Sequence, residues 1–272
     1  MKLHILGTAA AESLPATFCY CEVCRAARER GGREIRSRSQ ALISDKILID
    51  LPCDTLYHSL REGIDLSRIN HCIITHTHGD HFYPKELYNL KPNCAYNREV
   101  MQLYGNNSVG ETAAGIENST KGMLKFNKVE PFVPFYIDGI RITALKARHG
   151  STDPYFYMIE DGETSLLYAH DTDIFPEETW EYLRSTGVQF GAVSLDCTEG
   201  AHEDLSYHGH MCLGRNIRCR EKMIEYGIVN ENTKFILNHF SHNGLNVNYK
   251  EFCELAEPHG FSVSFDGMVV NI

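Results

Sequence analysis

The stretch His76-Thr77-His78-Gly79-Asp80-His81 places three histidines and one aspartate within six positions. It follows the apolar and β-branched run His71-Cys72-Ile73-Ile74-Thr75, so we expect it to form the loop at the end of a buried strand. Loops at strand ends commonly carry chemistry, because the scaffold beneath them is rigid. Three imidazoles and a carboxylate each need a polar partner when they are buried, and a bound metal ion would supply it.

Side-chain direction divides this stretch into two sets of candidate ligands. Because side chains alternate along an extended chain, His76 and His78 are expected to share one side of the loop. A turn at Gly79 would let Asp80 and His81 face a second centre nearby. We therefore favour a metal site over the alternative of a histidine-rich surface loop.

The motif resembles the H-x-H-x-D-H signature of the metallo-β-lactamase superfamily of hydrolases, and the resemblance extends over nearly the whole chain. Three further elements of that pattern follow in the expected order, each after a strand-like run. They are His149 in Ala147-Arg148-His149-Gly150, Asp171 in Tyr168-Ala169-His170-Asp171-Thr172, and His239 after Phe235-Ile236-Leu237-Asn238. Four ordered elements are far more specific than the first one alone.

The resemblance implies a dinuclear metal site. One ion would be held by His76, His78 and His149, and the other by Asp80, His81 and His239. Asp171 would bridge both ions, because a carboxylate has two oxygens to give to two metals. Zinc, manganese and iron all suit imidazole and carboxylate ligands, and ligand type alone does not choose among them. Asp50 is expected to orient a ligand histidine rather than to bind metal.

The resemblance also implies the fold. It predicts the α+β class and a four-layer αββα arrangement, in which two mixed sheets pack face to face with helices outside. The two halves of the chain, roughly 1–145 and 146–272, each give strands and then helices. We interpret residues 1–272 as a single domain that includes a cysteine insertion at 19–24.

This insertion carries three cysteines at C-x-C-x2-C spacing. Three thiolates at this spacing suit one tetrahedral ion, with a fourth ligand brought from elsewhere in the chain. A disulfide and ordinary buried cysteines are the alternatives. Within the superfamily the insertion resembles the branch containing the phosphoribosyl cyclic phosphate phosphodiesterase of the carbon-phosphorus lyase pathway. That resemblance implies a structural zinc held by Cys19, Cys21, Cys24 and His242, which stands three residues after His239.

The segment from Glu199 to His210 is a polar loop with three more histidines. By its place after the strand-like run 192–196, and by the sequence Gly209-His210-Met211, His210 matches the histidine that the branch uses beside its metals. His208 is the alternative, and His202 is interpreted as a surface imidazole. The catalytic residues implied in this way are Asp80, which is also a metal ligand, and His210.

Composition narrows the substrate class and the cellular compartment. The net charge is -10, from 26 basic and 36 acidic residues, which argues against broad attraction to polyanions such as nucleic acids. The basic stretch 25–38 has no interleaved aromatic residues, so we interpret it as a short helix followed by a solvated loop. No signal peptide or membrane-spanning run is seen, and ten cysteines without one favour thiols and metal sites. We therefore expect a cytoplasmic protein.

The remaining expectations concern individual elements. Hairpins are expected at 41–49, 155–169 and 262–270, helices at 84–90, 98–104, 176–185, 210–226 and 249–259, and strands at 192–196 and 234–238. The segment 106–122 is a long loop or a loosely packed helix, and we leave open whether it forms a lid or a plain connector.

Together these features predict a dinuclear metal-dependent hydrolase. The favoured activity is that of a phosphodiesterase on a small or cyclic phosphate ester, with a metal-bridging hydroxide as nucleophile. The alternatives are a tRNA-processing endonuclease, a lactamase, lactonase or thioesterase, and a non-hydrolytic protein resembling the pyrroloquinoline-quinone biosynthesis member of the superfamily. That last lineage tends to lose catalytic ligands, whereas all seven are present here. We expect a small phosphorylated substrate, neither membrane nor nucleic acid as partner, and leave a homodimer open.

Overall fold

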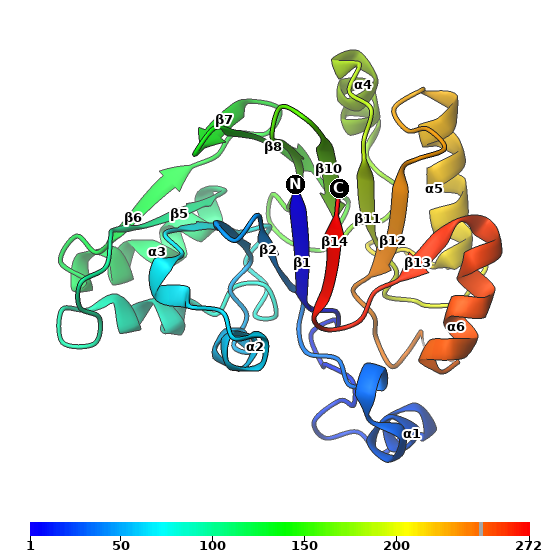
Figure 1. Ribbon diagram of the computed structural model, residues 1–272, viewed down its shortest axis with the longest axis horizontal. Helices are drawn as coiled ribbons and strands as arrows, with labels where there is room; N and C mark the ends of the chain where they lie inside the picture. The colour runs from blue at the N-terminus through cyan, green and yellow to red at the C-terminus, as the bar shows by residue number, and fades with distance from the viewer. Residues whose placement is uncertain (245–246) are drawn as a thin grey trace.

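Two seven-stranded sheets form the centre of the molecule, and helices cover their outer faces (Figure 1). The computed structural model describes residues 1–244 and 247–272. Helices α2 and α3 lie over the first sheet, and α4, α5 and α6 lie over the second, whereas α1 lies apart from both sheets (Figure 1). The predicted α+β class and four-layer αββα arrangement are confirmed.

The first sheet is antiparallel at one side and parallel at the other. β1 pairs antiparallel with β14 and β2, β2 pairs antiparallel with β3, and the strands from β3 to β6 run parallel. In spatial order its strands are β14 (Met268–Asn271), β1 (Lys2–Gly7), β2 (Gln40–Ile43), β3 (Ile47–Ile49), β4 (His71–Ile73), β5 (Met101–Gly105) and β6 (Leu124–Lys128).

The second sheet has the same mixed character. The strands from β10 to β13 run parallel, and β7, β8, β9 and β10 pair antiparallel. In spatial order its strands are β13 (Phe261–Val263), β12 (Lys234–Asn238), β11 (Ala192–Asp196), β10 (Ser165–Ala169), β9 (Tyr155–Glu160), β8 (Ile140–Lys146) and β7 (Pro134–Ile137).

Burial of apolar side chains explains the layers. Residues from both sheets, among them Ile5, Ile49, Tyr157 and Leu166, form one buried cluster between the sheets. Two further buried clusters lie between each sheet and its helices. The helices are α1 (Glu22–Arg30), α2 (Thr55–Glu62), α3 (Asn107–Ser119), α4 (Glu177–Thr186), α5 (Leu213–Glu225) and α6 (Tyr249–Ala256), with 3₁₀ turns at Gly32–Glu34, Leu66–Arg68, Pro84–Leu90 and Glu257–His259.

Several local predictions are confirmed. The hairpins at 41–49 and 155–169 are β2–β3 and β9–β10, and the predicted strands at 192–196 and 234–238 are β11 and β12. Helices form near 176–185 and 249–259 as expected. In the basic stretch 25–38 the helix is present, but Arg36 is buried and donates to Thr8 Oγ1 (2.9 Å) and to the carbonyl of Ser264 (2.8 Å), so this part is not a solvated loop.

The predicted helix at 98–104 is wrong, because this segment contributes β5 to the first sheet. Met101, Leu103 and Gly105 are buried and the residues between them are only partly buried, which is the two-residue alternation of a strand. The segment 106–122 contains α3, whose start is capped by the Asn106 side chain accepting from the amide of Val109 (3.0 Å). Its apolar side is buried against the first sheet, so the segment is a packed helix and not a lid.

The predicted terminal hairpin at 262–270 is also wrong. β13 pairs with β12 in the second sheet, whereas β14 pairs with β1 in the first. The turn between them crosses from one sheet to the other, and Asp266 anchors it by accepting from Thr8 Oγ1 (2.6 Å) and the amide of Ser37 (2.7 Å). The division at 145 and 146 fails for a related reason, because β7 and β8 belong to the second sheet and β14 to the first.

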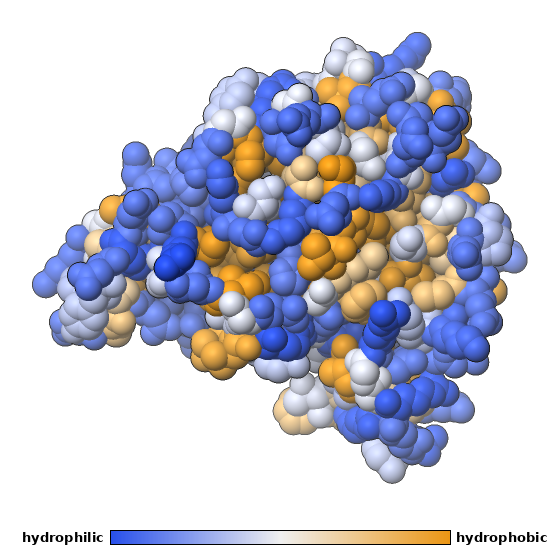
Figure 2. Space-filling model, viewed as in Figure 1, coloured by the Kyte–Doolittle hydropathy of each residue, from blue (hydrophilic) through white to orange (hydrophobic). Residues whose placement is uncertain are grey.

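The face in Figure 2 is mostly hydrophilic, with apolar groups gathered near its centre. No helix in the described ranges 1–244 and 247–272 is long and apolar enough to cross a membrane.

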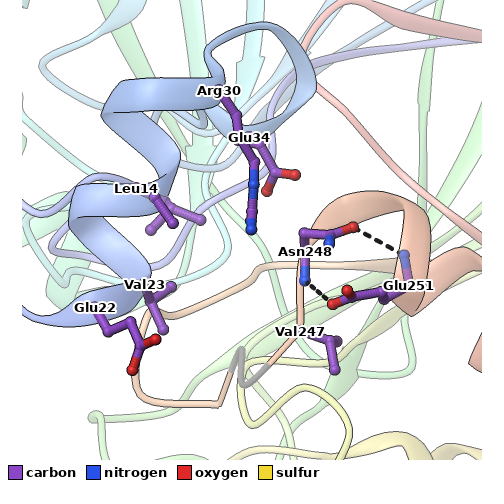
Figure 3. Close-up of a pocket in the computed structure, with 9 residues that line it drawn as sticks. Leu14, Glu22, Val23, Arg30, Glu34, Val247, Asn248 and Glu251 are labelled. Atoms are coloured by element: carbon purple, nitrogen blue, oxygen red, sulfur yellow. Dashed lines mark hydrogen bonds between the residues drawn. The ribbon is translucent and has the colours of Figure 1, made fainter.

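A pocket of about 240 Å³ lies between α1 and the start of α6, where Glu22 and Arg30 from α1 and Glu251 from α6 line it (Figure 3). It is separate from the site described next.

Candidate metal centre

Four strands of the two sheets deliver the candidate ligands to one place. The loop after β4 carries His76 and His81, and the ends of β8, β10 and β12 lead directly into His149, Asp171 and His239. Because these strands end at the meeting edges of the packed sheets, residues as far apart in sequence as Asp80 and His239 come within 3.8 Å of each other. We call these side chains the histidine–aspartate centre: His76, His78, Asp80, His81, His149, Asp171 and His239.

Three histidines form the first group of this centre. Donor atoms of His76, His78 and His149 all lie within 4.8 Å of one another. His78 Nδ1 lies 3.1 Å from His149 Nε2, and the ring centroids of His76 and His78 are 4.6 Å apart. This is the grouping that alternation of side chains and the resemblance predict together.

Four buried residues form the second group. Donor atoms of Asp80, His81, Asp171 and His239 lie within 4.8 Å of one another. Asp171 stands between the two groups, because its carboxylate lies 3.2 Å from His239 Nε2 and 3.7 Å from His76 Nε2. The structure thus brings together all seven predicted residues in the two predicted sets, and their role as ligands stays a proposal.

In neutral rings, hydrogen bonds on the outer nitrogens of His81 and His239 would leave the inner nitrogens without protons. His81 Nδ1 donates to Asp50 Oδ2 (2.7 Å), and His239 Nδ1 donates to Thr198 Oγ1 (2.8 Å). In neutral rings the two Nε2 atoms, which lie 3.1 Å apart, would therefore face each other with lone pairs. His76 Nε2 is buried and has no hydrogen-bond partner among the described residues. A cation between these nitrogens resolves both conflicts, so the donor set fits metal ions.

The charges of the centre lead to the same conclusion. Burial by itself would lower the pKa of His81, but the carboxylates of Asp171, Asp50 and Asp80 raise that pKa well above its usual value. Burial would raise the pKa of Asp171, yet His239 and His81 hold it well below its usual value. Protons on the imidazoles thus balance the buried carboxylates, and metal binding would release those protons.

The backbone at the centre adopts an uncommon conformation. Asp50, Asp171 and His239 have φ of 68°, 49° and 64°, in the left-handed region that residues other than glycine rarely occupy. Such strain persists only where the surroundings enforce it, and it is common at functional sites. Asp50 is fixed by accepting from the amide (2.8 Å) and hydroxyl (2.9 Å) of Thr75, which places it for the orienting role expected of it.

Of the two histidines left open in the polar loop, His210 lies at the centre. Its Nδ1 lies 2.9 Å from Asp196 Oδ2 and 3.3 Å from Asp171 Oδ1. Burial would lower the pKa of His210, but Asp196 outweighs this effect and raises the pKa to about 9. His208 is 67% exposed at its side chain and pairs instead with Asp173. His202 is half-buried and belongs to none of the metal-binding groups in the described part of the chain.

Sequence reasoning missed the residues that orient this histidine. Asp196, at the end of β11, accepts hydrogen bonds from the amides of Asp171 (3.1 Å), Thr198 (3.0 Å) and Met211 (2.9 Å). It also accepts from Thr198 Oγ1 (3.1 Å) and His210 Nδ1 (2.9 Å). A carboxylate oxygen of Asp196 lies near the donor atoms of Asp171, His210 and His239. Because five N–H and O–H groups already donate to this carboxylate, we interpret Asp196 as orienting its neighbours rather than binding metal. The available signal was an aspartate ending a buried strand, as at Asp171.

A cysteine cluster forms the second candidate metal site. Sγ of Cys19 and Cys21 lie 3.6 and 3.5 Å from His242 Nδ1, and Cys24 completes a group within 4.8 Å. All ten cysteines are free thiols. His242 lowers the pKa of Cys21 to about 6, whereas burial raises the pKa of Cys24 to about 11. Three sulfurs and one imidazole are a donor set typical of structural zinc.

The sequence comparison settles the family. The model for the β-lactamase superfamily domain matches residues 46–229, which include the H-x-H-x-D-H motif and two of the three later elements. The chain belongs to the β-lactamase superfamily. The resemblance drawn from the motif is therefore confirmed, and membership in this superfamily supports a hydrolase. No curated protein matches the chain in a sequence comparison.

Solved structures of this superfamily share the whole fold. A diphosphatase from the PhnP family has a TM-score of 0.77 and 21% identity, covering 99% of this chain and 96% of that one. Zinc-bound PqqB from Methylobacterium extorquens has a TM-score of 0.77 and 16% identity, covering all of both chains. The short form of human tRNase Z has a TM-score of 0.67 and 14% identity, covering 100% and 99%. At these identities the likeness shows the fold alone.

Proposed function

We propose that this protein is a dinuclear metal-dependent phosphodiesterase that acts on a small or cyclic phosphate ester. The observation that supports this best is the arrangement around Asp171. Its carboxylate lies between two groups of imidazoles, and His210, held on Asp196, lies 3.3 Å from it. Two cation sites and a proton donor therefore face the same small volume.

In this proposal His76, His78 and His149 would hold one divalent ion, Asp80, His81 and His239 would hold the other, and Asp171 would serve both. Manganese, zinc and iron all suit these ligands. When bound, the two ions would supply a water of lowered pKa and positive charge for the phosphoryl oxygens. Asp80 thus contributes to catalysis as a ligand. A separate structural zinc is proposed at Cys19, Cys21, Cys24 and His242.

His210 is proposed to supply a proton. Its Nδ1–H donates to Asp196 (2.9 Å), and its Nε2 has no hydrogen-bond partner among the described residues. In the metal-free chain Asp196 raises the pKa of His210 to about 9, which favours a second proton on the ring at neutral pH. As the oxygen of water bonds to phosphorus and the bond from phosphorus to the leaving oxygen breaks, that oxygen would take the Nε2 proton and become a hydroxyl group. Such proton transfer typically contributes about 10²- to 10⁴-fold in rate.

The charge of the protein supports a small substrate. With a net charge of -10 the surface offers no general attraction for a nucleic acid. Two neighbours in fold suggest what else to test: one is a diphosphatase and one is a tRNase Z. Neither observation favours a lactam, and the complete set of seven ligands counts against the non-hydrolytic, PqqB-like alternative.

A substrate panel assayed with manganese and with zinc tests the proposal. We expect hydrolysis of bis(p-nitrophenyl) phosphate and of a 2′,3′-cyclic nucleotide, with little on nitrocefin or precursor tRNA. With the 2′,3′-cyclic nucleotide, His210→Ala should lower kcat by about 10²- to 10⁴-fold while metal content stays unchanged. Strong lactam or tRNA cleavage with inert phosphodiesters would overturn the substrate class. If the protein cleaves only an inorganic or organic diphosphate, the proposed substrate would be a phosphoanhydride instead of a phosphate ester. If the metal-loaded protein is inert toward every substrate, the PqqB-like alternative would be favoured.

A further inference from the structure

The segment between β11 and α5 carries His210 but has almost no apolar support. Residues 203–210, which we call the 203–210 loop, are exposed or half-buried except Gly209. Two of its residues nevertheless reach the centre. The carbonyl of Gly209 accepts from His149 Nδ1 (2.9 Å), and His210 donates to Asp196. Because few apolar side chains hold this loop in place, polar interactions with other elements are needed to maintain these contacts.

One guanidinium supplies that order. Arg215, in the first turn of α5, is buried with 5% of its side chain exposed. Its N–H groups donate to five acceptors, four of them in the 203–210 loop. These acceptors are Asp204 Oδ1 (3.0 Å), the carbonyls of Leu205 (2.7 Å), Tyr207 (2.9 Å) and His210 (3.4 Å), and Asp173 Oδ1 (2.8 Å).

Asp173 connects this guanidinium to the rest of the centre. It lies two residues after Asp171 and is almost fully buried, and its second oxygen pairs with His208 Nδ1 of the loop. Its amide donates to the carbonyl of Arg148 (3.0 Å), the residue before His149. Arg215 and Asp173 therefore connect the 203–210 loop to the backbone next to His149 and to the backbone next to Asp171.

We propose that Arg215 is a positioning residue for catalysis: it holds the 203–210 loop so that His210 faces the reacting phosphate. This proposal rests on the proposed function. A lysine cannot replace the arginine, because the planar guanidinium reaches separated acceptors in fixed directions, whereas an ammonium offers three donors from one nitrogen. Arg215→Lys therefore keeps the charge and removes the geometry.

Arg215→Lys is tested beside Arg218→Lys, a matched control one turn further along α5. Arg218 is 47% exposed and contacts only Asp204 of the loop (3.0 Å). With 2′,3′-cyclic AMP, whose leaving oxygen is an alkoxide, we expect Arg215→Lys to lower kcat by about 10-fold or more, and KM to change less than about threefold. With bis(p-nitrophenyl) phosphate the loss should be smaller, because p-nitrophenolate leaves without a proton. Arg218→Lys should match the wild type with both substrates.

A double-mutant cycle with His210→Ala distinguishes positioning from a general structural role. If Arg215 acts through His210, Arg215→Lys causes no further loss of kcat in the His210→Ala background. An equal loss in both backgrounds, or an equal loss with both leaving groups, would overturn the proposal.

Amide hydrogen exchange gives a readout that does not depend on activity. In the metal-loaded protein, Arg215→Lys should increase exchange within 203–210 and leave the strands and the metal content unchanged. If the wild type cleaves no phosphodiester but exchange rises in this loop, the proposed function fails while the positioning role of Arg215 stands. Unchanged exchange in the loop, or loss of the metals, would overturn the positioning role itself.

Discussion

The histidine–aspartate centre and the cysteine cluster hold their donor atoms in different ways. In the centre, buried strands end at the ligands, and acceptors from other elements fix the outer nitrogens of three histidines: Asp50 for His81, Thr198 for His239 and Gly209 for His149. In the cluster, Cys21 is exposed and Cys19 is half-buried, and they lie on a loop before α1 rather than at a strand end. Glu12, 3.6 Å from His242 Nε2, is the carboxylate next to the cluster's histidine.

This difference leads to different expectations for the two proposed metal sites. The fold builds the centre in advance, since its ligands are oriented by packed strands and by hydrogen bonds between elements. The cluster joins two segments more than two hundred residues apart. Backbone hydrogen bonds between Phe240 and residues 8 and 10 (2.8 and 2.9 Å) and the hydroxyl of Ser241, which donates to Glu12, reinforce that junction nearby. Loss of metal from the centre should therefore abolish activity, whereas loss of metal from the cluster should lower the free energy of unfolding.

The largest expected effect is loss of activity on replacing a ligand of the centre. His78→Ala should lower the phosphodiesterase rate by at least about a thousandfold, because one proposed ion would lose a ligand. Each factor of ten in this rate corresponds to about 1.36 kcal/mol of lost transition-state stabilisation. His78 is exposed, and its ring lies against the imidazoles of His76 and His149, so the Tm of the metal-free protein should stay within about 2 °C of wild type. His202→Ala is the control and should retain full activity. A large fall in Tm for His78→Ala would contradict the comparison.

The next effect is loss of stability at the cluster. Cys21→Ser should release one zinc and lower the free energy of unfolding by about 2 to 4 kcal/mol, as for a cross-link that closes a long loop. This corresponds to a fall in Tm of about 5 to 10 °C. Cys94→Ser, which changes an exposed cysteine outside the cluster, should leave both quantities unchanged. If Cys21→Ser melts like wild type and keeps its zinc, the cluster is not a zinc site.

A third prediction concerns the protonation of the cluster without metal. Only the thiolate is alkylated, so the rate at Cys21 should rise through pH 6 and level off above it, since its pKa is lowered to about 6. Cys24, with a pKa raised to about 11, should stay protonated and slow at neutral pH. His242→Ala removes the main cause of the lowered pKa, so Cys21 should then titrate near the usual value of about 8.5. An unchanged profile in this variant would show that His242 does not act on Cys21.

The sequence was sufficient to predict which side chains gather at both proposed metal sites, because their signals are local. Each ligand of the centre follows an apolar, strand-like run, and strand ends of packed sheets meet at an edge. The four-layer arrangement followed from the same pattern through the resemblance. These predictions needed no knowledge of which strand pairs with which.

The residues behind the ligands could not be predicted, because their contacts depend on tertiary register. Asp196 and Thr198 act on His210 and His239 across separate elements, and Arg215 acts on the loop that precedes its own helix. The errors in the fold have a similar origin. β5 is a short strand, so its two-residue alternation is too brief to stand out in the sequence. The chain after β13 pairs with β1, which lies at the other end of the sequence.

The smallest expected effect tests whether a carboxylate supports the cluster as such groups support the centre. Glu12 Oε1 lies 3.6 Å from His242 Nε2 and accepts a hydrogen bond from the hydroxyl of Ser241. Because this distance is longer than the 2.7 Å between Asp50 and His81, the support should be weaker.

Glu12→Gln keeps the shape and the acceptor oxygen but removes the charge that favours an imidazole bound to zinc. We expect the cluster's zinc affinity to fall about 10-fold, at the low end of the range for residues behind metal ligands. Activity should stay within about threefold of wild type, because the centre keeps its own orienting contacts. The control is Glu22→Gln, an exposed acid of α1 that faces the pocket in Figure 3. Competition with a chelator measures both variants, and equal zinc retention by the two would show that the cluster is held by its four ligands alone.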